Sequence, residues 1–202
     1  MPSRLIKVGV LFLLFLFPAI FGWIHIKTYY NYFITNSMFA LSAKYYDLAI
    51  VDSKVKKNEI IFTIKNAIVL QDIHGNERNF TMDITLDMEA VTFNIPMTIS
   101  ILLAIILSAK ILPKKRWEIF YTGFLLLFML HMFSMLLLSF CTIKEIANIN
   151  PYIHYYLHKH YLANEFVCAI KDFLINYAAR FEPFLIAFFA WYEVQRKERL
   201  VD

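Results

Sequence analysis

Long apolar runs alternate with polar stretches along the chain, and four of the runs have the length of a membrane crossing. A hydrocarbon core of about 30 Å is crossed by about 20 mostly apolar residues in a helix. Such runs occupy residues 1–27, 93–112, 117–140 and 173–195. The pattern predicts an α-helical integral membrane protein with four transmembrane helices.

The first run has a competing interpretation as a cleaved signal peptide. Arg4 and Lys7 stand beside an apolar stretch, as in a secretory signal. The stretch from Leu5 to Ile26 is long, however, and Ala19 is followed by Ile-Phe-Gly-Trp rather than by a small-residue cleavage site. We therefore predict an uncleaved anchor.

Residues 28–92 change to a polar pattern with β character, which predicts an extracytoplasmic α+β domain. The spacing within 29–48 suits a helix that continues the first span along the interface. Four β-type runs follow at 48–51, 59–64, 67–70 and 80–86. Apolar and polar residues alternate strictly in the last run, which predicts one solvent-exposed face and one buried face. Gly75 and Asn76 supply turn chemistry before it. The expected structure is a small antiparallel β-meander of three or four strands.

The basic residues predict which side of the membrane each segment occupies. They cluster near the N-terminus, in a short turn at 113–116 and in the tail at 196–202. Four spans place all three clusters on one side, which the positive-inside rule assigns to the cytoplasm. The chain is then a multi-pass protein of a bacterial inner membrane with both termini cytoplasmic. Residues 141–172 form an outer loop, where Asn150-Pro151 starts an interfacial helix rich in tyrosine and histidine.

Composition agrees with this class and excludes others. Hydrophobic residues make up 59% of the 202 residues, well above the roughly half that is usual for soluble domains. The net charge of +4 is not gathered into a nucleic-acid-binding patch. Expected partners are therefore membrane lipid and a membrane protein. No cofactor and no set of catalytic residues is predicted.

Charged residues inside the last span are the main candidate for a functional site. Arg180 and Glu182 lie near the middle of the run, and Arg180 is about 10 Å from its outer end at 1.5 Å per residue. His131, with Ser134 three residues further on, lies about 13 Å from the same side on the third span. Intramembrane ionisable groups are costly and mark functional sites by default. The alternative is that Arg180 snorkels to the surface or that the charges form a structural ion pair.

The outer segments hold three weaker candidates. His154 and His158 have the i, i+4 spacing of a metal-binding pair, but a wet interfacial face explains them better, so no metal site is predicted. Cys141 and Cys168 could join as a disulfide worth about 3 kcal/mol, or stay as two buried thiols; a nucleophilic cysteine has no sequence signature here. Asn79 begins an Asn-Phe-Thr sequon, a candidate glycosylation acceptor.

The order of elements resembles that of the small membrane proteins encoded beside exosortases, in particular the exosortase H-associated membrane proteins. The resemblance rests on the entry Thr92-Phe-Asn-Ile-Pro-Met97, the short basic turn and a last span that contains Pro183. It implies an accessory role in a system that processes and sorts surface proteins, with the catalytic residues on the exosortase partner.

Three hypotheses follow for the function. The first is a non-enzymatic accessory or scaffold protein of an exosortase-type sorting system. The second is a membrane-embedded enzyme that acts at the outer leaflet through the residues of the last span and His131. The third is a small transport subunit, although four helices leave little room for a polar pathway unless the protein forms an oligomer.

Overall fold

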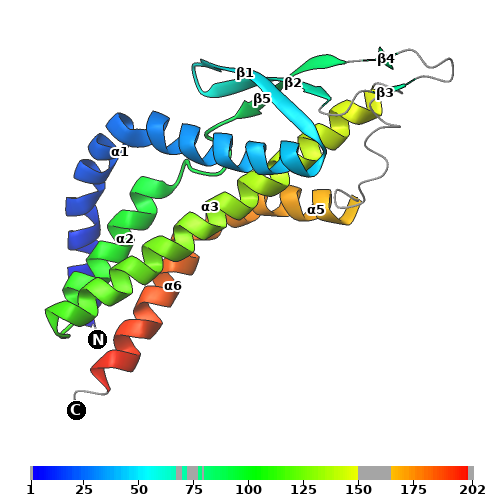
Figure 1. The fold of residues 1–202 in the computed structure, drawn as a ribbon. Coiled ribbons are helices and arrows are strands. Elements are labelled where there is room, and N and C mark those ends of the chain that lie inside the picture. The colour runs from blue at the N-terminus through cyan, green and yellow to red at the C-terminus, as the bar shows by residue number, and fades with distance from the viewer. Residues whose placement is uncertain (1, 67–69, 72–76, 79, 150–164, 200–202) are drawn as a thin grey trace. The chain divides into compact units, whose positions relative to one another are not determined.

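The computed structural model describes residues 2–66, 70–71, 77–78, 80–149 and 165–199. They form two compact units that are each assembled from separate parts of the chain. The first unit comprises Met1–Thr28, Thr92–His131 and Asn176–Asp202, and the second comprises Tyr29–Val91 and Met132–Ile175. Helices α1 (Pro2–Tyr45) and α3 (Pro113–Ile149) contribute residues to both units (Figure 1). The described part of the chain is mainly helical, with a small three-stranded antiparallel sheet and a short two-stranded one.

Within the described residues, two helices are long and apolar enough to cross a membrane. They cover Arg4–Tyr45 and Pro113–Ile146. A third crossing exists if α5 (Glu165–Phe173) and α6 (Ala179–Glu198) count as one broken span. The predicted span at 93–112 is only the 14-residue helix α2 (Ile95–Ser108), which at 1.5 Å per residue is about 21 Å long. The helical membrane class is therefore confirmed. The described helices give two or three candidate spans by length, rather than the predicted four.

Element boundaries differ from the predicted ones for identifiable reasons. The break before α3 lies at 109–112 rather than at 113–116, because Pro113 is the first residue of the helix, where a missing N–H costs nothing. Helix α3 continues to Ile149, nine residues beyond the predicted end at 140. The last run is not one uniform α-helix, since a π-helical segment at Leu174–Ala178 precedes α6. The predicted continuation of the first helix does occur, as α1 reaches Tyr45.

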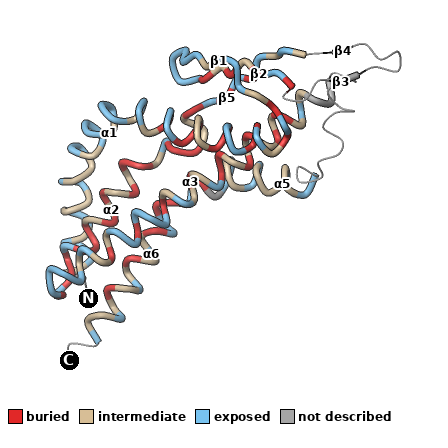
Figure 2. Tube along the Cα trace, viewed as in Figure 1, coloured by how far each residue is buried: buried red, intermediate tan, exposed pale blue. Residues whose placement is uncertain are grey.

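In the first unit, α2 is a largely enclosed helix, and it packs against α6. Figure 2 shows buried positions along α2 and mostly intermediate or exposed ones along the first half of α1. Helix α2 also approaches α3 closely at Gly123, where an added Cβ would lie 3.1 Å from both terminal carbons of Leu102. Glycine at this position therefore lets the two helices come together.

One end of the first unit is held by a chain of charged contacts. Arg4 donates to Oε2 of Glu198 at 2.8 Å, and its guanidinium lies 4.8 Å from the ring centre of Trp191. Oε1 of Glu198 accepts the backbone N–H of Lys110 at 3.1 Å, while Arg116 donates to the carbonyl of Ala109 at 3.0 Å. The peptide bond between residues 109 and 110 is thus satisfied on both sides. These contacts place the first turn of α1, the α2–α3 turn and the end of α6 at the same end of the unit.

The second unit contains a three-stranded antiparallel sheet in the order β1-β2-β5. Its strands are β1 (Leu48–Lys56), β2 (Glu59–Asn66) and β5 (Thr81–Asp87), and a two-residue pair, β3 (Leu70–Gln71) with β4 (Glu77–Arg78), lies between β2 and β5 in sequence. The predicted antiparallel sheet is confirmed with three strands. The alternation predicted for 80–86 is also confirmed, since Ile84 and Leu86 are buried and the residues beside them are exposed.

The sheet buries one face against helical residues of its own unit. Phe39 of α1 stacks on Phe62 of β2 with ring centres 4.0 Å apart. The remaining core comes from both helices and strands: Ala43, Tyr46, Leu48, Ile60, Ile64, Ile84, Leu86, Met88 and Ile143. A sheet of three short strands cannot bury a sufficient core alone, and these helical residues complete it. Burial raises the pKa of Tyr46 to about 12, and the neighbouring Tyr45 adds to the effect.

Candidate functional site

A hydrogen-bonded cluster centred on Glu182 lies in the interior of the first unit. Oε2 of Glu182 is 2.7 Å from Nε2 of His131 on α3, and Oε1 is 2.8 Å from the hydroxyl of Thr98 on α2. Glu182 and His131 are each only 1% exposed, and Thr98 is fully buried. The cluster therefore joins α2, α3 and α6 through side chains that solvent does not reach.

Asn94 makes a second polar connection between α2 and α6. Its side-chain amide donates to the backbone carbonyl of Ala179 at 2.7 Å. In an uninterrupted α-helix that carbonyl would accept the N–H of residue 183, but Pro183 has none. A buried carbonyl without a donor is destabilising, so Asn94 supplies the hydrogen bond that the proline removes. The backbone carbonyl of Asn94 is in turn 3.1 Å from the Thr98 hydroxyl.

The contact between His131 and the last helix is made by Glu182, while Arg180 takes no part in it. Arg180 is exposed, two residues before the buried glutamate, so the two side chains point to different faces of α6. Ser134 is buried but belongs to the second unit, and it is not assigned to the cluster. Of the four predicted residues, the structure thus brings together Glu182 and His131.

The geometry of the cluster determines what it can do chemically. Both carboxylate oxygens of Glu182 are engaged, one by an imidazole nitrogen and one by a hydroxyl. When Nε2 of a neutral ring carries the proton, it donates a charge-assisted hydrogen bond to the carboxylate, and when the ring is protonated on both nitrogens the contact is an ion pair. A general acid or base must come within hydrogen-bonding distance of a substrate atom. Enclosed groups that bond to one another can stabilise helix association, because interhelical hydrogen bonds hold the packing together.

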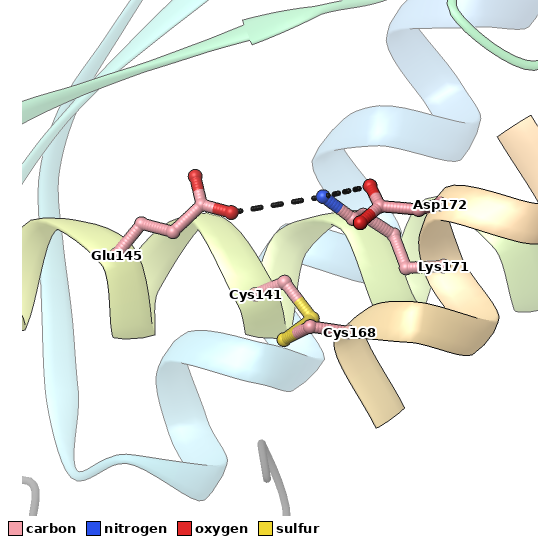
Figure 3. Close-up of a disulfide and its surroundings, with 5 residues drawn as sticks. All are labelled: Cys141, Glu145, Cys168, Lys171 and Asp172. Carbon is pink, nitrogen blue, oxygen red and sulfur yellow. Dashed lines mark ion pairs between the residues drawn. A yellow bond between two sulfur atoms is a disulfide. The ribbon is translucent and has the colours of Figure 1, made fainter. Parts of the chain in front are cut away.

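In the second unit, Cys141 of α3 and Cys168 of α5 are joined as a disulfide (Figure 3). Their Cα atoms are 5.7 Å apart, and Cys141 is completely buried. Lys171, one helical turn after Cys168, pairs with Asp172 at 2.7 Å and with Glu145 of α3 at 3.6 Å. The bond and the ion pair together fasten α5 to the second half of α3.

His154, His158 and Asn79 all lie outside the described residues, as does most of the predicted interfacial helix. Among the residues that the structure describes, no group of three His, Cys, Asp or Glu side chains is arranged to hold a metal ion.

Sequence reasoning missed Thr98 and Asn94, which are the α2 members of the site. One signal for Asn94 was present, because a proline inside an apolar helix leaves the carbonyl four residues earlier without its usual donor. The sequence shows that Ala179 needs a donor, but it does not show which residue of another helix supplies it. Thr98 gave no signal, since buried threonines commonly donate to their own helix.

Comparison with known proteins gives no family for the chain: no family model matches it, and neither do curated proteins or solved structures.

Proposed function

We propose that this chain is a non-enzymatic accessory or scaffold protein of a bacterial inner membrane that acts by binding a membrane-protein partner. The proposal rests on the burial of Glu182. This acid of the last apolar run is enclosed, and each of its oxygens bonds to a side chain of another helix, so it supports helix packing rather than a reaction. Arg180 is exposed and lies outside this cluster.

The partner class follows from the resemblance to exosortase-associated membrane proteins. We propose an exosortase-type enzyme, or one of its surface-protein substrates, as the partner. The second unit supports such a role because Ile50, Val51 and Val55 are exposed along β1. Among the described residues β1 pairs only with β2, so its other edge is open to a partner.

The proposed topology has four crossings with both termini in the cytoplasm. The contact between Arg4 and Glu198 supports an even number of crossings, since it places both ends of the first unit together. Helix α2 is short for a lipid-facing span, but most of its residues are buried among protein. A helix enclosed by protein need not match the full hydrocarbon thickness, because the polar backbone groups at its ends meet protein rather than lipid.

Purification in mild detergent with identification of co-purifying proteins tests the function. We expect a membrane protein to be recovered with the wild type and to be lost when Val51 and Val55 are both changed to aspartate. Lys65→Asp, a charge change at an exposed position of β2, is the control for altered surface charge alone. Turnover of a lipid or peptide by the isolated protein, with no recovered partner, would overturn the proposal.

Labelling of single cysteines in a Cys141→Ser/Cys168→Ser background tests the topology. An impermeant maleimide applied to spheroplasts should label Asn58→Cys, whereas Lys114→Cys should react only after lysis. Labelling of both sites before lysis would exclude cytoplasmic placement of the turn near residue 114.

A further inference from the structure

A pocket of about 320 Å³ opens between α3 and α6 near the charged end of the first unit. Its volume is at the lower end of the range for small-molecule sites, about 300–1,000 Å³. The lining combines two acids, two bases, a hydroxyl and two apolar side chains: Glu118, Ile119, Thr122, Phe189, Glu193, Arg196 and Lys197. None of these residues belongs to the Glu182 cluster.

The pocket is lined by equal numbers of acidic and basic side chains, and this balance indicates the kind of ligand that fits it. Lys197 pairs with Glu118 at 2.5 Å, and Arg196 pairs with Glu193 at 2.7 Å. Each group keeps hydrogen-bonding capacity beyond its pair, since a lysine carries three N–H donors, an arginine five, and a carboxylate about four lone pairs. Two of the four are well shielded from water, with side-chain exposures of 14% for Lys197 and 15% for Glu193. A ligand with both a negative and a positive group matches this lining better than a simple anion does.

The surroundings of the pocket are those of a membrane–water interface. Glu118 is five residues after the start of α3, and Glu193 is five residues before the end of α6. Trp117, Tyr121 and Tyr192 are exposed beside it, as aromatic residues are at headgroup level. Exposed apolar residues lie further along both helices at helical spacing from lining residues: Leu125 and Met129 after Thr122 on α3, and Leu185 before Phe189 on α6. These stripes offer a path for acyl chains that begins at the charged lining.

We propose that the pocket binds the headgroup of a zwitterionic phospholipid of the phosphoethanolamine type. Lys197 and Arg196 contact the phosphate, and Glu193 and Glu118 accept hydrogen bonds from the primary ammonium. The acyl chains follow the exposed stripes of α3 and α6. This site is independent of the proposed protein partner, because its residues belong to the first unit whereas β1 belongs to the second.

Native mass spectrometry of the full-length protein in detergent tests the proposal, with phosphatidylethanolamine, phosphatidylcholine and phosphatidylglycerol of identical acyl chains as probes. We expect phosphatidylethanolamine to bind about tenfold more tightly than phosphatidylcholine, whose trimethylated nitrogen has no N–H to donate. Phosphatidylglycerol should also bind more weakly, because it offers the two carboxylates no cation.

Matched variants connect the binding to the pocket. Lys197→Met should weaken phosphatidylethanolamine binding about tenfold through loss of a charge-assisted contact. Glu193→Gln should abolish the preference over phosphatidylcholine while the protein melts as the wild type does. Lys114→Met, an exposed lysine at the same end but outside the lining, should leave both unchanged.

Three results would overturn the assignment. Equal binding of the three lipids excludes a headgroup-selective site, and tighter binding of phosphatidylglycerol makes it an anion site. Competition by soluble phosphoethanolamine at the same concentration as the lipid would make the ligand a free metabolite rather than a membrane component.

Discussion

The side-chain amide of Asn94 replaces the backbone hydrogen bond that Pro183 cannot make. It donates to Ala179, the residue four positions before the proline, at 2.7 Å. The pair links the start of α2 to the first turns of α6. Helices that meet in an apolar medium have little hydrophobic driving force between them, so such a contact contributes to their choice of partner.

Asn94→Ala should destabilise the protein by about 1–3 kcal/mol, the cost of leaving a buried carbonyl without a donor. In a Pro183→Ala background the same change should cost much less, because an alanine at that position returns the helical N–H to the carbonyl of Ala179. The measurement is a double-mutant cycle of unfolding in mild detergent. If Asn94→Ala lowered the free energy of unfolding equally in both backgrounds, the amide would not be replacing the N–H that Pro183 lacks.

Glu182→Ala should destabilise the first unit by about 3–5 kcal/mol, because it breaks a buried pair and removes the carboxylate that bonds to both His131 and Thr98. Arg180→Ala is the matched control, two residues away on the same helix and exposed. We expect it to change stability by less than about 0.5 kcal/mol. Thermal unfolding and protein level in the membrane measure both. A larger loss of stability in Arg180→Ala than in Glu182→Ala would show that Arg180, and not Glu182, makes the stabilising contact.

Reduction of the disulfide should loosen the second unit. The bond closes a loop across a sequence separation of 27 residues, for which loop entropy gives about 3 kcal/mol. Cys141→Ser, Cys168→Ser and the double variant should all lose about this amount, since each removes the same bond. Wild-type protein should also migrate differently on gels with and without reductant. Unchanged unfolding in the double variant would contradict a structural role for the bond.

Alkaline pH should destabilise the second unit through Tyr46. Its pKa is about 12 in the folded protein and about 10 when unfolded, so the unfolded chain releases this proton first. Stability from this group is complete below pH 10 and is lost as the pH rises to about 12, by up to about 3 kcal/mol. Tyr46→Phe, which cannot ionise, should show a shallower decline over that range. Parallel pH profiles for the two proteins would contradict the prediction.

Replacing Gly123 with leucine should push α2 and α3 apart and lower stability, whereas the same replacement at Gly9 should not lower stability. A leucine at 123 meets Leu102, and such overpacking costs about 1–3 kcal/mol. Gly9 has nothing within 4 Å of an added Cβ, so Gly9→Leu is the control at an open helix position. Unfolding in detergent compares the two. Similar stability of both variants would mean that the helices do not pack closely at Gly123.

Local patterns in the sequence determined the membrane class, the sheet and the polar residues of interest. The strict alternation at 80–86 was sufficient to predict one buried and one exposed face, because side chains on a strand point to opposite sides in turn. Length and hydropathy likewise identified the apolar helices, although they placed the break before α3 four residues too late and overestimated the length of α2. Those boundaries depend on Pro113 as a helix start and on contacts with other helices.

Only the tertiary structure decided which polar groups meet. The sequence placed Arg180, Glu182 and His131 at similar depths, but depth does not fix the rotation of a helix about its axis. Residues two apart on a helix point about 200° apart, so only one of Arg180 and Glu182 could face His131. In the packing of α2 against α6, Glu182 faces inward and meets Thr98, while Asn94 meets the backbone carbonyl of Ala179. The sequence determined that a buried charge would need a partner, and the helix packing determined that the partner is His131.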